Sequence, residues 1–91
     1  MGKETRLFKS EERHSRADAS SFICQLADKM SAGQVVLRAG DNEITLEIPE
    51  SVMLEIQVED EDKGAKGIQH SLEIEIKWYD DDQGSGHLEL G

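Results

Sequence analysis

The chain has little of what usually stabilises a small fold or carries chemistry. Its 91 residues include one cysteine, one proline and few aromatic side chains. The single cysteine, Cys24, cannot form a disulfide within the chain, and its apolar-periodic surroundings predict an inert, partly buried thiol. A lone thiol is typical of a reducing compartment, so we expect a cytoplasmic location.

Long apolar runs are also missing. The longest have three residues, as in Val35–Leu37, whereas a membrane span needs about 20. The first six residues lead into no apolar segment, so the sequence predicts no signal peptide and no membrane partner.

No catalytic or metal-binding pattern can be found. A structural zinc site needs four cysteine or histidine ligands at short spacing, and the chain does not offer that set. The acidic runs 60–62 and 80–82 lack the spacing of a tight calcium loop. No nucleophile stands in a recognisable arrangement with a base. We therefore expect no metal, no cofactor and no enzyme activity.

Charge is abundant and unevenly distributed. The formal net charge is −10, with about +2 on residues 1–38 and about −12 on residues 39–91. Nucleic-acid surfaces are neutralised by Lys and Arg, so direct nucleic-acid binding is disfavoured. The acidity is explained by solubility, by a basic protein partner or by bound cations, and the sequence leaves the three open.

The first half predicts one helix. Ser15-Arg-Ala-Asp18 is a capping pattern, in which Ser15 accepts a hydrogen bond from a first-turn amide. Gly33 is the expected left-handed end of the helix. Between them, apolar residues recur at steps of three and four and form one stripe. That stripe consists of Ala19, Phe22, Ile23, Leu26, Ala27 and Met30.

Alternation of apolar and polar residues predicts the strands. Residues 5–10 read as a short first strand, and four more follow Gly33, over 34–39, 43–48, 52–59 and 68–78. A turn at 40–42, a break at 49–51 and a loop at 60–67 separate these four strands. Residues 80–91 read as an acidic, glycine-containing loop or disordered tail.

The fold class that follows is α+β, in the order β-α-β-β-β-β. One amphipathic helix packs on a mainly antiparallel sheet within a single domain, residues 1–79. Five strands span about 24 Å, whereas one helix covers about 10 Å of that width. Another copy of the chain would cover the remaining apolar rows most simply, so we expect a homodimer.

Four residues of the last strand and its end are the candidates for that contact. Trp78 and Tyr79 belong to the types enriched in binding hot spots, and Ile76 precedes them on the apolar face. Alternation places His70 on the same face, as a hydrogen-bonded histidine or as a pH-sensitive contact. Trp78 can also be a plug at the end of the sheet, and the sequence leaves both roles open.

The opposite face is acidic, with Glu73 and Glu75 on one strand and Glu47 and Glu55 expected on neighbouring strands. Carboxylates at alternate positions recur about every 6.6 to 6.8 Å, close to the spacing of phosphates along a nucleic-acid strand. The sequence thus predicts an interaction or assembly module, self-associating through the sheet face or edge. The alternative is an acidic decoy that occupies a nucleic-acid site on a basic protein.

A family resemblance adds to this interpretation. The string Leu72-Glu-Ile-Glu-Ile-Lys-Trp78 resembles the amphi-Trp domain family of small prokaryotic proteins, named for an amphipathic strand that ends in tryptophan. Support comes from Ile44–Glu50 and from the preceding helix-to-glycine stretch, so that the resemblance covers residues 4–79. It implies a fold and no established activity or cofactor.

Overall fold

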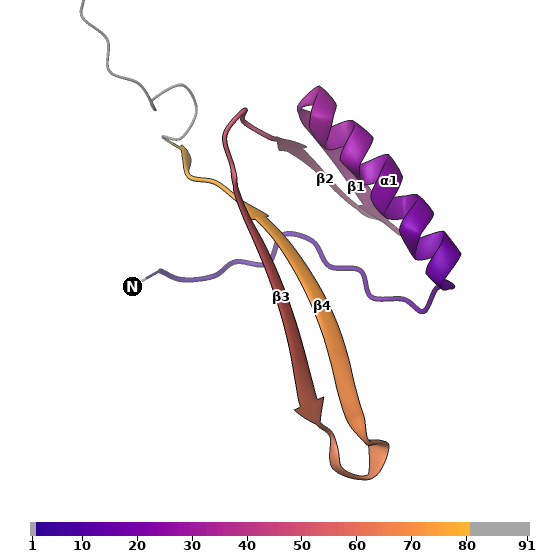
Figure 1. Cartoon of the computed structure of the whole chain (residues 1–91). Coiled ribbons are helices and arrows are strands. Elements are labelled where there is room, and N and C mark those ends of the chain that lie inside the picture. Colours follow the sequence, from indigo (N-terminus) through magenta and orange to yellow (C-terminus); the bar gives the residue numbers. More distant parts are fainter. Residues whose placement is uncertain (1, 81–91) are drawn as a thin grey trace, which may run out of the picture. The chain divides into compact units, whose positions relative to one another are not determined.

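The computed structural model describes residues 2–80 (Figure 1). Their elements are α1 (Arg16–Ala32), β1 (Gln34–Ala39), β2 (Asn42–Glu47), β3 (Met53–Asp62), a 3₁₀ turn η1 (Gly64–Lys66) and β4 (Ile68–Lys77). The chain divides into two compact units, Met1–Ile48 and Pro49–Gly91, and each is described by itself. One helix followed by four antiparallel strands confirms the α+β class.

Both ends of α1 form as the sequence predicts. Ser15 adopts an extended backbone and its Oγ accepts a hydrogen bond of 3.0 Å from the amide of Asp18. At the other end Gly33 has φ 94°, and its amide donates to the carbonyl of Met30 at 3.0 Å. A side chain at Gly33 would be strained at this φ, so glycine ends the helix there.

Replacing Ser15 by alanine is expected to lower the free energy of unfolding of the first unit by about 1 kcal/mol, because a helix amide loses its acceptor. Urea unfolding followed by helical circular dichroism measures this loss. Ser20→Ala, inside the helix, is the control and should leave stability unchanged or slightly higher, since alanine is the better helix former. Equal losses in both variants would argue against the cap.

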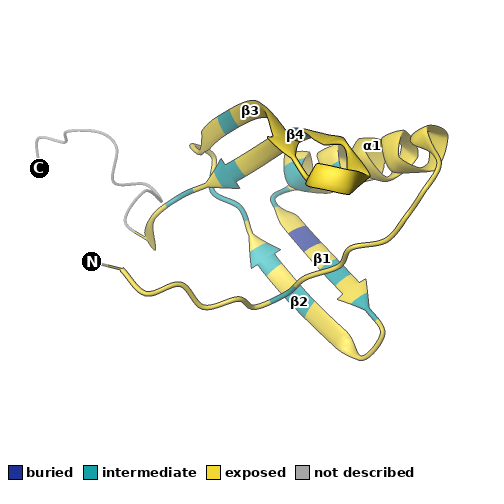
Figure 2. Cartoon of the chain, turned by 90° about the horizontal axis from the view of Figure 1, so that it is seen from below, coloured by how far each residue is buried: buried dark blue, intermediate teal, exposed yellow. Residues whose placement is uncertain are grey.

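The first unit is built by α1 and the β1–β2 hairpin. Antiparallel pairing sets Val35 opposite Leu46 and Leu37 opposite Ile44, so that one face of the hairpin is apolar. Helix α1 packs along β1. Val35 is 2% exposed and is the one buried residue among the described residues (Figure 2). The core of this unit is therefore small and centred on Val35.

The strand expected at residues 5–10 is not formed. Residues 2–15 have no regular structure, and of their side chains that of Phe8 alone is half-buried. The alternation over these six residues is weak. Each described strand pairs only within its own hairpin, so residues 5–10 have no strand to pair with. Phe8, rather than Leu7, is the side chain that turns inward.

The four later strands form two hairpins rather than one sheet. β1 pairs with β2 and β3 with β4, both antiparallel. The break at 49–51 is present, and β3 continues to Asp62, so that the second loop is shorter than expected. It is closed by a hydrogen bond of 2.8 Å from the Lys63 amide to the Gly67 carbonyl. No helix in the described part is long and apolar enough to cross a membrane.

Candidate interaction surface

The β3–β4 hairpin has one aliphatic face. Because side chains alternate along a strand, every second cross-strand pair lies on the same side. Three successive pairs on one side are aliphatic, namely Leu54 with Ile76, Ile56 with Ile74, and Val58 with Leu72. We call these six residues the aliphatic face. The predicted separation of apolar and acidic sides in this hairpin is thereby confirmed.

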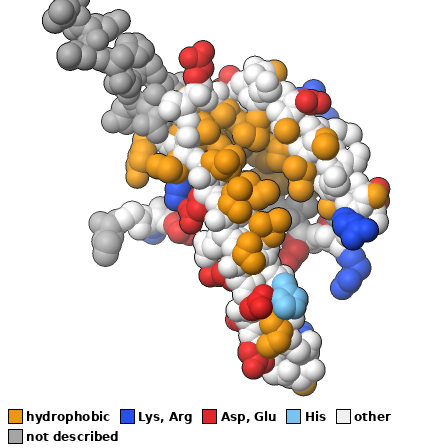
Figure 3. All heavy atoms as spheres, viewed as in Figure 1, with side chains coloured by type: hydrophobic (Ala, Val, Ile, Leu, Met, Phe, Trp, Pro, Cys, Tyr) orange, Lys and Arg blue, Asp and Glu red, His pale blue; other side chains and the backbone are white. Residues whose placement is uncertain are grey.

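Most of the aliphatic face is open to solvent. Ile76 is half-buried, and the other five side chains belong to residues that are between 54% and 72% exposed. Apolar side chains gather on the hairpin in the space-filling view, and acidic and histidine side chains interrupt them towards the loop (Figure 3). A two-stranded hairpin is marginal by itself in water, and contiguous apolar patches on soluble proteins mark contact sites. This face is therefore the strongest candidate for an interaction surface.

His70 and Asp60 form the next pair along the same side. They lie opposite each other in the register, and His70 Nδ1 is 2.6 Å from Asp60 Oδ1. Both side chains are exposed. His70 is thus hydrogen-bonded at the edge of the apolar face rather than turned inward, and its role as a pH-sensitive contact stays a prediction.

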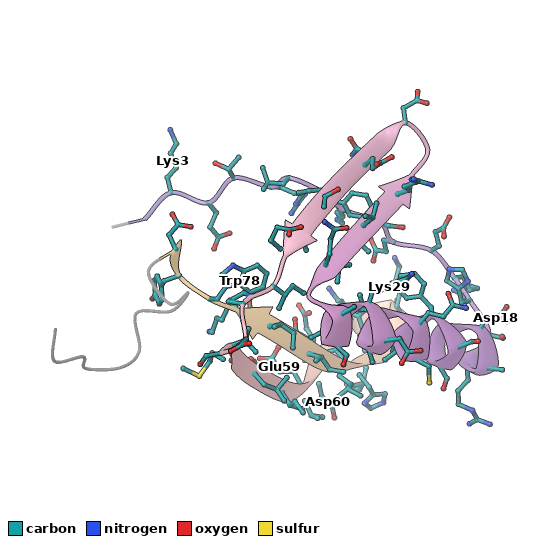
Figure 4. The ribbon with its side chains drawn as sticks, turned by 90° about the horizontal axis from the view of Figure 1, so that it is seen from above. Lys3, Asp18, Lys29, Glu59, Asp60 and Trp78 are labelled. Atoms are coloured by element: carbon teal, nitrogen blue, oxygen red, sulfur yellow. The ribbon has the colours of Figure 1, made fainter. Side chains whose placement is uncertain are left out.

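Trp78 follows the other end of the aliphatic face. It comes directly after β4 (Figure 4) and is half-buried there, whereas Tyr79 is 78% exposed. A shallow hollow of this unit is lined by both aromatic residues together with Ser51, Val52, Met53 and Lys77. Trp78 is thus brought next to the segment that enters β3, a contact that the sequence did not reveal.

The acidic side of the hairpin is partly neutralised. Glu55 and Glu75 lie opposite each other, and Lys77 Nζ is 2.9 Å from Glu55 Oε1 and 3.6 Å from Glu75 Oε1. The hydrogen bond from Lys77, together with its charge, holds the pKa of Glu55 below its ordinary value of 4.5. The hydrogen bond to Glu55 and the two carboxylate charges raise the pKa of Lys77 above 10.5. The lysine thus offsets the repulsion expected between facing carboxylates.

The four predicted acidic residues do not all lie on neighbouring strands. Glu73 lies on β4 opposite Gln57, on the same side of the hairpin as Glu55 and Glu75. Glu47 belongs to β2, which pairs with β1 and not with β3, and its Oε2 accepts a hydrogen bond of 2.7 Å from Gln34. The expectation of strands neighbouring β4 is therefore right for Glu55, whose strand β3 pairs with β4, and wrong for Glu47, because the chain leaves one hairpin at Pro49 and starts another.

Acid is expected to weaken the hairpin through Glu55. Since its pKa is lowered in the folded chain, its contribution is present above pH 4.5 and is lost as the pH falls through the folded pKa. The stability difference between the wild type and Glu55→Gln should therefore shrink between pH 7 and pH 3. Urea unfolding followed by Trp78 fluorescence measures it.

Glu73→Gln is the matched control, because it removes a carboxylate from the same side without breaking an ion pair within residues 2–80. A difference for Glu55→Gln that stays constant from pH 7 to pH 3 would contradict the role of Lys77.

Other candidate chemistry is not assembled in the described part. No group of three or more histidine, cysteine or acidic side chains there could hold a metal ion. Cys24 is exposed, so the expectation of a partly buried thiol is wrong. At 100° per residue, Cys24 lies beside the apolar stripe of α1 and not within it. The predicted tail lies outside the described residues except for Asp80.

The pairing of Asp60 with His70 was not predicted, although the sequence contains a signal for it. In a hairpin, residues at equal distances from the loop centre pair. Positions that add up to 130 are paired throughout β3 and β4, as for Asp60 and His70. With the loop assumed to begin at residue 60, that register could not be set.

Comparison with known proteins supports the resemblance seen in the sequence. No curated protein and no solved structure matches the chain. The model of the Amphi-Trp domain matches residues 1–91, and the structure ends an amphipathic strand immediately before Trp78. Since the match covers the whole chain, this protein belongs to the Amphi-Trp domain family.

Proposed function

We propose that the chain is an assembly module that forms a homodimer through the aliphatic face of the β3–β4 hairpin. One observation carries the proposal: three successive cross-strand pairs are aliphatic, and five of these six residues are more than half exposed. An isologous interface needs a surface that is complementary to itself, and an uncharged aliphatic face meets that need.

The energy of burying this face is sufficient for a modest dimer. Each of the five exposed side chains gains about 1 kcal/mol on burial, and two copies together gain about 10 kcal/mol. Association costs at least about 4 kcal/mol in lost freedom. At this lowest cost the surplus is about 6 kcal/mol, which corresponds to a dissociation constant of tens of micromolar.

Sedimentation equilibrium between 1 and 500 µM tests the proposal. The average mass should rise from the chain mass of 10.2 kDa towards twice that value. A mass that stays at 10.2 kDa over the whole range would falsify dimerisation and would leave the face to be covered within the chain.

Salt separates self-association from binding to a basic partner. Two copies that each carry a net charge of −10 repel, so screening should tighten the dimer several-fold between 0.05 and 0.5 M NaCl. Binding to a basic protein, including the decoy hypothesis, should weaken over the same range, because the attraction is screened. Sedimentation at the two salt concentrations measures the first effect. A dimer that weakens with salt would contradict an aliphatic interface between acidic copies.

A further inference from the structure

The aliphatic face is symmetric about its middle pair, Ile56 and Ile74. Two residues away on either side lie aliphatic pairs. Four residues away, at about 13 Å, the two ends differ. One end has Asp60 opposite His70, and the other has Val52 and Trp78, which line one hollow. A rotation that exchanges the two ends therefore superposes aliphatic pairs on aliphatic pairs.

We infer that the two copies pack face to face and antiparallel, with the two-fold axis crossing both strands at Ile56 and Ile74, so that His70 of one copy meets Trp78 of the other. This inference rests on the proposed homodimer and adds its geometry. β4 then faces the second copy's β4, and the junction between His70 and Trp78 occurs twice in each dimer. Each of these contacts therefore consists of His70 from one copy and Trp78 from the other.

Charge selects this arrangement over the parallel one. Asp60 and Asp62 lie on the side of the aliphatic face, at the end near the loop. Segment 59–66 carries four carboxylates and two lysines, and Lys63 is already 3.3 Å from Glu61 on the opposite side. Parallel packing would place two such acidic ends about one sheet spacing, 10 Å, apart, and like charges at that distance are destabilising. Antiparallel packing holds the two Asp60 residues about 26 Å apart, well beyond the screening length of about 8 Å.

The chemistry of the junction is also favourable. Packed sheets lie about 10 Å apart, and the long indole of Trp78 can reach across where the shorter Val52 and Asp60 cannot. The imidazole of His70 is oriented by Asp60 at 2.6 Å. It can stack on the indole, and in its protonated form it gains a cation–π attraction. Trp78 would thus be an interface residue.

Distances between spin labels test the orientation. Labels at Gln69→Cys, in a Cys24→Ser background, lie on the outer side and five residues from the axis. We expect a separation of about 40 Å in the antiparallel dimer and about 20 Å in a parallel one. Glu73→Cys, one residue from the axis, is the matched control and should give about 20 Å in both. A separation near 20 Å for Gln69→Cys overturns the inference and leaves the dimer intact, whereas a chain mass of 10.2 kDa removes the dimer itself.

A double-mutant cycle tests the contact. Within one chain, His70 and Trp78 are eight residues apart along an extended strand, about 26 Å, so they cannot couple directly. His70→Ala and Trp78→Ala should each raise the dissociation constant. In the double variant the fold-increase in the dissociation constant should be at least about fivefold smaller than the product of the two single fold-increases. The reason is that the shared contact is lost only once. For Gln69→Ala combined with Trp78→Ala, the two fold-changes in the dissociation constant should simply multiply, because these residues do not touch across the interface. If the fold-changes for His70→Ala and Trp78→Ala also simply multiply, the contact between His70 and Trp78 is refuted.

Discussion

Replacing Val35 by aspartate should unfold the helix and the β1–β2 hairpin together. Val35 is 2% exposed and is the one buried residue in the described part of the chain. A carboxylate there would lose water without a partner and would cost several kcal/mol. Small domains are stable by about 5–15 kcal/mol, and a core this small belongs to the lower end. The expected result is loss of most of the helical circular dichroism at 25 °C.

Val36→Asp is the matched control for that substitution. Val36 is the next residue along β1, is 43% exposed, and points to the other side, opposite Thr45. A carboxylate at this position keeps its water, so we expect a loss of about 1 kcal/mol or less. If Val35→Asp keeps the helical signal, or if both variants unfold alike, Val35 is not the centre of the first unit.

The helix could be predicted because its signals are local. Ser15 and Asp18 lie within one turn, and Gly33 acts through its own φ, so neither depends on distant parts of the chain. The faces of the strands could be predicted for a similar reason, because alternation follows from backbone geometry alone. Over residues 54–58 and 72–76, the pairs of β3 and β4 separate aliphatic from polar and acidic residues as the alternation requires.

Pairing between strands could not be predicted, because it depends on distant contacts. Residues 5–10 alternate weakly and have no partner among the described strands, so they form no strand. Alternation also does not say which strand lies beside which, and one five-stranded sheet was expected where two hairpins form. The separation of Glu47 from Glu55 follows from this.

The residues that make up the candidate surface were largely predicted, but how much of that surface is exposed was not. Ile76, Trp78 and His70 were placed on one apolar side, which the register confirms for Ile76 and His70. That some apolar rows would stay uncovered follows from the width of one helix, but which residues these are could not be foreseen, because exposure depends on what covers a face and not on alternation. The role of Lys77 between two glutamates likewise required the register.

Replacing Ile56 by lysine should convert the proposed dimer to a monomer. In a face-to-face dimer Ile56 lies at the axis, so two ammonium groups would be buried together without partners. The cost is about 4 kcal/mol or more, which corresponds to at least about 1,000-fold weaker association. Lysine also lowers the net negative charge of −10, so general repulsion between copies cannot explain a loss. Sedimentation equilibrium at 100 µM, where the wild type is largely dimeric, should give the mass of one chain.

Gln57→Lys makes the same charge change one residue away, on the acidic side of β3 opposite Glu73. Because that side stays in water in a face-to-face dimer, this variant should associate as the wild type does, or slightly more tightly because repulsion between copies falls. Pairing along a free strand edge would leave both variants dimeric, since backbone hydrogen bonds at an edge do not require the aliphatic side chains. Dimerisation that survives Ile56→Lys would therefore move the interface from the face of the hairpin to its edge, and loss of association in both variants would mean that added charge, not burial of Ile56, disrupts the dimer.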